Sequence, residues 1–168
     1  MKKLLYLVVL IVVFAALAVS CRNTPQGQTP TSQPTVIITN ISDILRREWK
    51  LIQVHSGDRI IEFNRIELIS AGAGDIFTLV IDSETFSGVG APNRYSAPYS
   101  VSAEDPLAIT VALLRSTLMA QIHYPERLRE QEFYVYMQNA YRWDLVNNNL
   151  VLYSKNESGN DVAMVFSL

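Results

Sequence analysis

The sequence predicts a mainly β domain with one helix. Three observations favour this class: short apolar segments of strand length, clusters of turn residues between them, and only one segment with clear helical periodicity. The chain has 168 residues, of which 49% are hydrophobic, so it can build the core of one ordinary domain. A series of short strands separated by turns is typical of a β-sandwich or a β-barrel.

The expected strands follow one another from Ser42 to the end of the chain. Ser42 is a candidate cap for a short helical turn that runs to Arg47. Turn residues at 56–58, 71–75 and 147–149 interrupt the apolar segments. The strands are expected at residues 49–54, 60–63, 65–69, 76–81, 86–89, 95–101, 107–114, 141–145, 150–153 and 161–166.

Two prolines and one helical pattern refine this expectation. Pro92 and Pro98 cannot donate a ladder hydrogen bond, so they mark a loop, an edge or a bulge. A helix is expected over residues 125–139, because Pro125 suits a first helical position. Apolar residues then recur at helical spacing at Phe133, Tyr136, Met137 and Ala140. The carboxylates of Glu130 and Glu132 are expected on the solvated face of this helix.

The first residues follow the three-part plan of a secretory signal peptide. Lys2 and Lys3 precede an uncharged apolar run at residues 4–19, which ends in small residues just before Cys21. This run is shorter than the roughly 20 residues that a helix needs to cross a hydrocarbon core. Cleavage is therefore favoured over the alternative, an uncleaved signal anchor.

The segment Ala18-Val19-Ser20-Cys21 resembles the bacterial lipobox. The resemblance implies that residues 1–20 are removed and that Cys21 carries a diacylglyceryl group with acyl chains such as palmitate. Two or more acyl chains anchor a protein stably to a membrane. Arg22, rather than Asp, follows the cysteine, which by resemblance to the sorting rule of Gram-negative lipoproteins implies the outer membrane rather than the inner one. We therefore expect a lipid-anchored protein of the cell envelope.

A flexible linker is expected between this anchor and the domain. Residues 22–40 are rich in Thr, Gln, Ser, Asn and Pro and have no apolar periodicity before Val36. The expected organisation is therefore a signal peptide at 1–20, lipidated Cys21 with a linker to residue 42, and a domain at 43–168. Cys21 is the only cysteine, so no intramolecular disulfide can form.

The charge balance argues against a nucleic-acid partner. The chain has 14 basic and 16 acidic residues, and removal of Lys2 and Lys3 would leave 12 basic residues and a net charge near −4. Nucleic-acid binding needs clustered Lys and Arg that neutralise phosphates. The expected partners are a membrane, through the lipid on Cys21, and an envelope protein, while the identity of any small ligand stays open.

Four segments in order carry a family resemblance: residues 49–51, residues 87–99, residues 116–120, and a glutamate-bearing helix before residues 150–152. Together they resemble the META domain of the heat-inducible HslJ-like lipoproteins. The central family pattern is matched by Gly88, Gly90, Asn93, Tyr95 and Tyr99. The resemblance implies a small antiparallel β-barrel, lipocalin-like in outline, with one helix packed against it.

This chain departs from the family pattern at its cysteines. Ala91-Pro92 replaces one cysteine, and Gln121 stands where many members have another. The loss of both thiols together removes any redox role at these positions.

The segment from Gly88 to Tyr99 is the candidate recognition site. In one interpretation Asn93, Arg94, Tyr95 and Tyr99 form a recognition loop, because Tyr and Arg are common at contact hot spots. In the alternative, which we favour, the glycines permit a bulge or turn and the tyrosines cover the core.

No catalytic residues, metal ligands or cofactor are expected. The chain lacks the sequence motifs of hydrolases, zinc peptidases and phosphate-binding loops. His55 and His123 have no neighbouring ligands in the sequence, so each is expected at the surface or at a strand end.

Two functions follow. The resemblance implies a non-enzymatic envelope lipoprotein that serves envelope integrity or stress tolerance through protein contact. The alternative is a carrier of a small apolar ligand inside the barrel. Inward-pointing Phe77, Phe86, Trp143 and Phe166 would favour the first function, whereas a lined void above roughly 300 Å³ would favour the second.

Overall fold

The computed structural model describes residues 42, 44–120 and 127–168, which lie in the compact unit Thr35–Leu168. The expected signal peptide, Cys21, the linker, Pro125 and His123 therefore lie outside the described residues. Within the described ranges, no helix is long and apolar enough to span a membrane.

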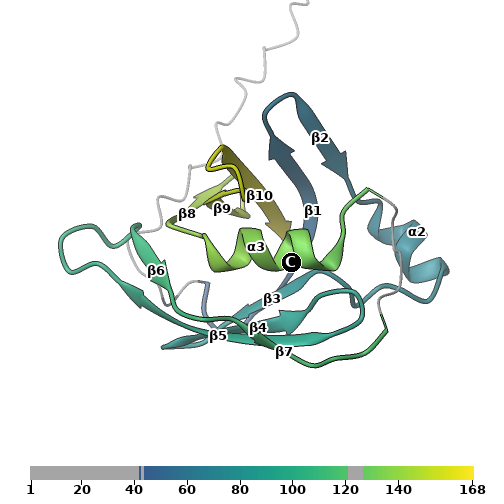
Figure 1. Cartoon of the computed structure of the whole chain (residues 1–168), viewed down its shortest axis with the longest axis horizontal. Coiled ribbons are helices and arrows are strands. Elements are labelled where there is room, and N and C mark those ends of the chain that lie inside the picture. Colours follow the sequence, from purple (N-terminus) through teal and green to yellow (C-terminus); the bar gives the residue numbers. More distant parts are fainter. Residues whose placement is uncertain (1–41, 43, 121–126) are drawn as a thin grey trace, which may run out of the picture. The chain divides into compact units, whose positions relative to one another are not determined.

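Antiparallel strands form a nearly closed barrel of eight members (Figure 1). Their order is β6 (Ile109–Val111), β5 (Arg94–Val101), β4 (Thr85–Val89), β3 (Thr78–Ile81), β1 (Glu48–Ser56), β10 (Asp161–Ser167), β9 (Asn149–Lys155) and β8 (Arg142–Val146). The two end strands meet through backbone hydrogen bonds. Ile109 N donates to Tyr141 O at 3.0 Å, and Trp143 N donates to Leu107 O at 3.0 Å. The barrel that the family resemblance implied is thus confirmed.

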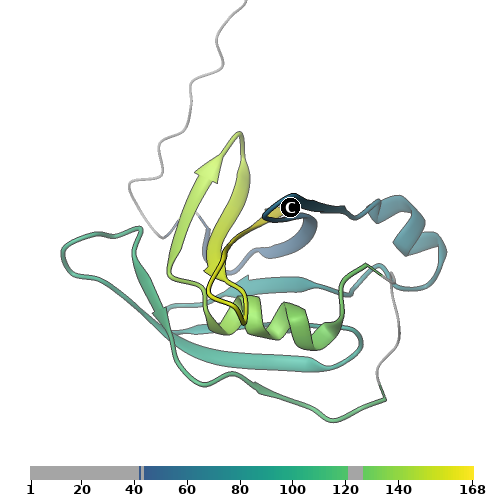
Figure 2. The same ribbon diagram turned by 45° about the horizontal axis from the view of Figure 1, so that its top comes forward.

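Two short strands lie beside this path. β2 (Arg59–Glu62) pairs with the second half of β1, and β7 (Arg115–Ser116) pairs with β5. Helix α3 (Glu130–Gln138) lies between the strands β3–β5 and the strands β8–β10 in both views (Figures 1 and 2). A second short helix, α2 (Arg65–Ser70), follows β2.

The strands form where buried and exposed side chains alternate. β5 buries Tyr95, Ala97 and Tyr99 and exposes the residues between them. Pro98 is tolerated because β5 changes its partner there, from β7 at Ser96 to β6 at Tyr99, so no ladder donor is required of it.

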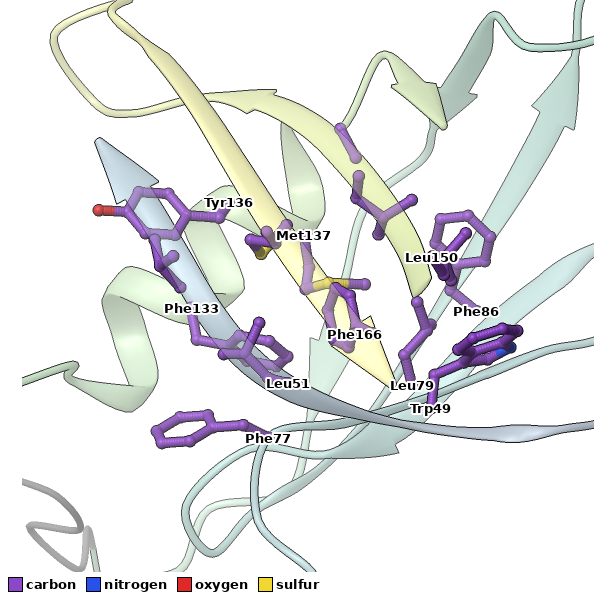
Figure 3. Close-up of a cluster of buried hydrophobic side chains, with 14 of the residues drawn as sticks. Trp49, Leu51, Phe77, Leu79, Phe86, Phe133, Tyr136, Met137, Leu150 and Phe166 are labelled. Carbon is purple, nitrogen blue, oxygen red and sulfur yellow. The ribbon is translucent and has the colours of Figure 1, made fainter. Parts of the chain in front are cut away.

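Large side chains fill the barrel interior (Figure 3). Phe77, Phe86 and Phe166 have 0% of their surface exposed and Trp143 has 3%. The ring of Phe77 lies 5.2 Å from that of Phe133, centroid to centroid, so α3 contributes to the same core as the strands. The interior consists of packed side chains, as in other small barrels.

One expected strand was wrong, and the expected helix is confirmed with a later start. Residues 65–69 form helix α2 instead of a strand, because the Asn64 side chain caps it by accepting from Ile66 N at 3.1 Å and Glu67 N at 3.4 Å. Helix α3 begins at Glu130, later than the expected start at residue 125. Arg129 has an extended backbone, and Leu128 beside it is buried in the core.

Two expected strands were too long. The strand expected at 76–81 begins only at Thr78, because Phe77 has a positive φ of 50° that interrupts an extended backbone. The strand expected at 107–114 is reduced to β6, and Leu113 beyond it is 73% exposed. The other expected strands agree with β1, β2, β4, β5, β8, β9 and β10 within a few residues.

Candidate functional site

The loop between β4 and β5 is the centre of the candidate site. Gly90 N donates to Asn93 O at 2.6 Å and closes the turn, while Phe77 N donates to Gly90 O at 2.9 Å. The peptide bond between Ala91 and Pro92 is cis, and the cis form of an X-Pro bond is typically found in a tight turn. Other backbone donors of this turn cannot bond within it, so they need a partner elsewhere.

Glu130, the first residue of α3, supplies that partner. Its Oε1 accepts from Ala91 N at 2.5 Å and from Asn93 N at 2.7 Å, and its Oε2 accepts from Asn93 Nδ2 at 2.7 Å. Tyr134 OH donates to the same Oε1 at 3.0 Å. Glu130 is only 4% exposed, so the carboxylate is a buried anchor for the loop. The expectation that Glu130 is solvated was wrong.

Asn93 joins this anchor to a third segment. Its Oδ1 accepts from Thr117 Oγ1 at 2.9 Å and from Met119 N at 2.6 Å. Its backbone oxygen lies 2.9 Å from Tyr134 OH, whose single proton is shared between this oxygen and Glu130 Oε1. The side chain of Asn93 is therefore surrounded by the turn, by the segment after β7 and by α3. These are three of the four segments on which the family resemblance rests, and one residue connects them.

The two glycines of the signature are required by close contacts. A Cβ on Gly90 would lie 2.5 Å from Tyr134 OH and 2.6 Å from Glu130 Oε1. A Cβ on Gly88 would clash with the backbone carbonyl of Thr78. Only glycine lets the loop approach both the anchor and β3 this closely.

The two tyrosines of the signature bind β5 to the ends of β3. Tyr95 OH donates to Thr78 O and Tyr99 OH donates to Asp82 O, both at 2.8 Å. Burial raises the pKa of Tyr95 well above its usual value, and nearby Tyr134 adds to the shift. Burial, followed by the charge of Asp82, raises the pKa of Tyr99 to about 12.

Of the four predicted recognition residues, the structure brings three into the interior. Asn93 is 4% exposed, Tyr95 3% and Tyr99 6%, whereas Arg94 is exposed. Arg94 is thus the member of the set whose side chain is open to a partner. A recognition role for this loop stays a prediction.

The remaining titratable candidates lie apart from this loop. His55 on β1 makes a 2.7 Å hydrogen bond between its Nε2 and Gln53 Oε1. Glu132 is half-buried, and its Oε1 accepts from Arg59 Nη1 at 2.7 Å and from Tyr136 OH at 2.5 Å. In the part of the chain that the structure describes, no three His, Cys, Asp or Glu side chains gather as metal ligands would.

Sequence reasoning missed the role of Glu130 because its partners are distant in the chain. Ala91 and Asn93 precede it by 39 and 37 residues. Glu130 and Glu132 lie two residues apart near the start of a helix, and such a charged pair is typical of a solvated helix face. The glutamate-bearing helix of the family resemblance was the one signal that pointed to it.

Fold and site together define a small antiparallel barrel whose glycine-rich turn is held by a buried glutamate of the packed helix. A model of the META domain family matches residues 42–166. This match covers the whole described barrel up to β10 and includes both the turn and Glu130. The chain belongs to the META domain family.

Two solved structures are similar to this chain, and the first of them supports the fold. One is the NMR structure of a protein from Burkholderia xenovorans, at 17% identity and a TM-score of 0.52, covering 86% of this chain and 97% of that one. The other is the crystal structure of a DUF4847 family protein from Bacteroides vulgatus ATCC 8482, at 14% identity and a TM-score of 0.47, covering 75% and 94%. None of the curated proteins that were compared matched this chain.

Proposed function

We propose that this chain is a lipid-anchored envelope protein whose META domain serves envelope integrity or stress tolerance through protein contact, without catalysis. The single observation that carries the proposal is the filled interior. A barrel of this size either packs side chains inside or leaves room for one small ligand. Phe77, Phe86, Trp143 and Phe166 all belong to the buried core, which favours contact through the surface over the carriage of an apolar ligand.

The hollows of the domain agree with this preference. Hollows of about 540, 360 and 310 Å³ all have charged side chains in their linings, and the first of them is lined mainly by polar and charged residues. Their linings include Arg59 and Glu62 at the two ends of β2 and Glu48 at the start of β1. Polar, open hollows of this kind are unlike the mostly apolar sites that hold small apolar ligands.

The site chemistry favours a structural role for the buried carboxylate. Both oxygens of Glu130 accept hydrogen bonds from the loop, and Tyr134 OH adds a further donor. A general base needs a lone pair directed at a substrate proton. Glu130 instead holds the turn that presents Arg94 at the surface.

The lipid attachment to the membrane is tested by substitution of Cys21. Cys21→Ala is expected to abolish labelling with a palmitate analogue and to release the protein from membranes, because the thiol is the predicted lipid attachment point. Ser20→Ala keeps a small residue beside the cleavage point and serves as the matched control. Retained membrane attachment of Cys21→Ala would refute the anchor.

The contact role is tested in a deletion strain of the host. We expect the unmodified chain to restore resistance to detergent stress and Arg94→Ala to restore less, at equal protein level, because Arg94 is the exposed member of the loop. Arg47→Ala removes an equally exposed arginine far from the loop in sequence and should behave as the unmodified chain. Equal restoration by all three would contradict a contact through this loop.

A further inference from the structure

A hollow beside the start of α3 gathers arginine side chains. Its volume is about 540 Å³, and its walls come from the β1–β2 hairpin, from the segment that enters α3, and from the turn between β9 and β10. Three of its lining residues are Arg59, Arg127 and Arg129. None of these three arginines belongs to the loop that Glu130 holds.

Two of these arginines flank one buried residue. Leu128 is 3% exposed and belongs to the core, while Arg127 and Arg129 on either side of it are exposed. Residues 127 and 128 lie in a turn and a bend, and Arg129 has an extended backbone with φ −78° and ψ 146°. The side chains of Arg127 and Arg129 both line the hollow, with the buried leucine between them.

The third arginine already has partners. Arg59 Nη1 donates to Glu132 Oε1 at 2.7 Å, and its other terminal nitrogen donates to the backbone oxygen of Arg127. Tyr136 OH also donates to Glu132 Oε1, so this oxygen accepts two hydrogen bonds. Arg59 is thus bound to Glu132 and to the Arg127 backbone, and it contributes positive charge to the hollow.

The charges of the lining do not balance. It contains three arginines and two carboxylates, Glu132 and Glu157. Among the described residues, the side chains of Arg127 and Arg129 form no ion pair. The lining therefore has an excess of positive charge, although the whole chain has a net charge of −2. This local excess favours the binding of an anion in the hollow.

We infer that the hollow binds the phosphate group of an organic phosphate between Arg127 and Arg129. Two planar guanidinium groups present several donors to one anion, and a phosphate monoester has three terminal oxygens that can accept them. The volume is within the range of small-molecule sites, so it has room for more than a bare phosphate. Val135 and the ring of Tyr136 supply a partly apolar wall for the organic part. This inference is independent of the proposed protein contact.

The same chemistry occurs in a soluble phosphate monoester and in a phospholipid headgroup, so the test uses both. The full chain is purified in nonionic detergent and titrated by calorimetry with glycerol 3-phosphate, and separately with phosphatidic acid in mixed micelles. Glycerol and diacylglycerol are the uncharged comparators. Binding of either phosphate probe, without binding of its comparator, is expected, and the probe that binds identifies the source.

Paired arginine variants assign the binding to the hollow. Arg127→Ser with Arg129→Ser should weaken binding by about tenfold or more, because charge-assisted hydrogen bonds to the phosphate are lost. Arg47→Ser with Arg115→Ser changes the charge equally at exposed sites outside the hollow and should leave binding unchanged. If the first pair fails to fold, Arg127→Lys with Arg129→Lys keeps the charge and should still bind more weakly, because the planar forks are lost. Binding of neither probe, or equal binding by all variants, would overturn the inference.

Discussion

Removal of the Glu130 carboxylate should cost the domain a large part of its stability. Glu130→Ala leaves Ala91 N, Asn93 N and Asn93 Nδ2 without their acceptor in a buried site. Each buried donor left unsatisfied costs about 1–3 kcal/mol, so we expect the three donors together to cost about 3–9 kcal/mol, with the lower end favoured if water enters the space. Single domains have only about 5–15 kcal/mol of stability. The variant should therefore be near the limit of folding.

A milder variant separates the hydrogen bonds from the volume of the side chain. Glu130→Gln keeps one oxygen for the two backbone donors but turns an NH₂ group toward Asn93 Nδ2, which is itself a donor. We expect a loss of about 1–3 kcal/mol, smaller than that of Glu130→Ala.

Urea unfolding followed by the fluorescence of Trp49 and Trp143 measures both losses. Glu132→Ala is the comparison variant, because this neighbouring glutamate loses an ion pair with half-exposed Arg59 and one hydrogen bond from Tyr136 OH, and should therefore cost about 1–3 kcal/mol, less than Glu130→Ala. A Glu130→Ala protein within about 1 kcal/mol of the unmodified chain, or no less stable than Glu132→Ala, would refute the anchoring role.

Further predictions concern the glycine and the tyrosines of the loop. Gly90→Ala should destabilise the domain by about 1–3 kcal/mol, because its Cβ would overlap Tyr134 OH and Glu130 Oε1, whereas Ser96→Ala at an exposed position of β5 should not; equal urea midpoints would contradict this. For Tyr99, folding raises the pKa from 10.0 to about 12, so its contribution to stability is complete below pH 10 and is lost as the pH rises through about 12. The urea midpoint should fall over that window, and less steeply in Tyr99→Phe; an unchanged slope in that variant would exclude Tyr99 as a cause.

Local periodicity was sufficient to predict most strands. β5 and β10 alternate buried and more accessible side chains, and β1 does so up to its irregularity between Leu51 and Gln53. That period of two is visible in the sequence. Residues 65–69 also alternate, Arg-Ile-Glu-Leu-Ile, yet they form α2, with only Leu68 buried and the cap of Asn64 at its start. The capping residue Asn64 is visible in the sequence, but a six-residue helix is too short for its periodicity to be distinguished from that of a strand.

Contacts between distant segments could not be predicted from periodicity. The closure of the barrel depends on β6 and β8, which are more than thirty residues apart in the chain, and only the family resemblance implied it. The burial of Glu130 likewise depends on the turn at residues 90–93, which was recognised as distinctive without its partner. Alternation along a strand reports which face is buried, but it does not report which distant residue a polar group will meet.

The filled interior is the central claim, and native mass spectrometry of the full chain released from detergent micelles tests it most directly. We predict that the native mass equals the denatured mass of the same preparation, because Phe77, Phe86, Trp143 and Phe166 occupy the space that a ligand would need. The Phe86→Ala variant, which opens a cavity, provides a preparation able to take up a small apolar probe for comparison. An additional mass in the unmodified chain, lost on denaturation and absent from the solvent and detergent, would contradict the claim and identify a carrier.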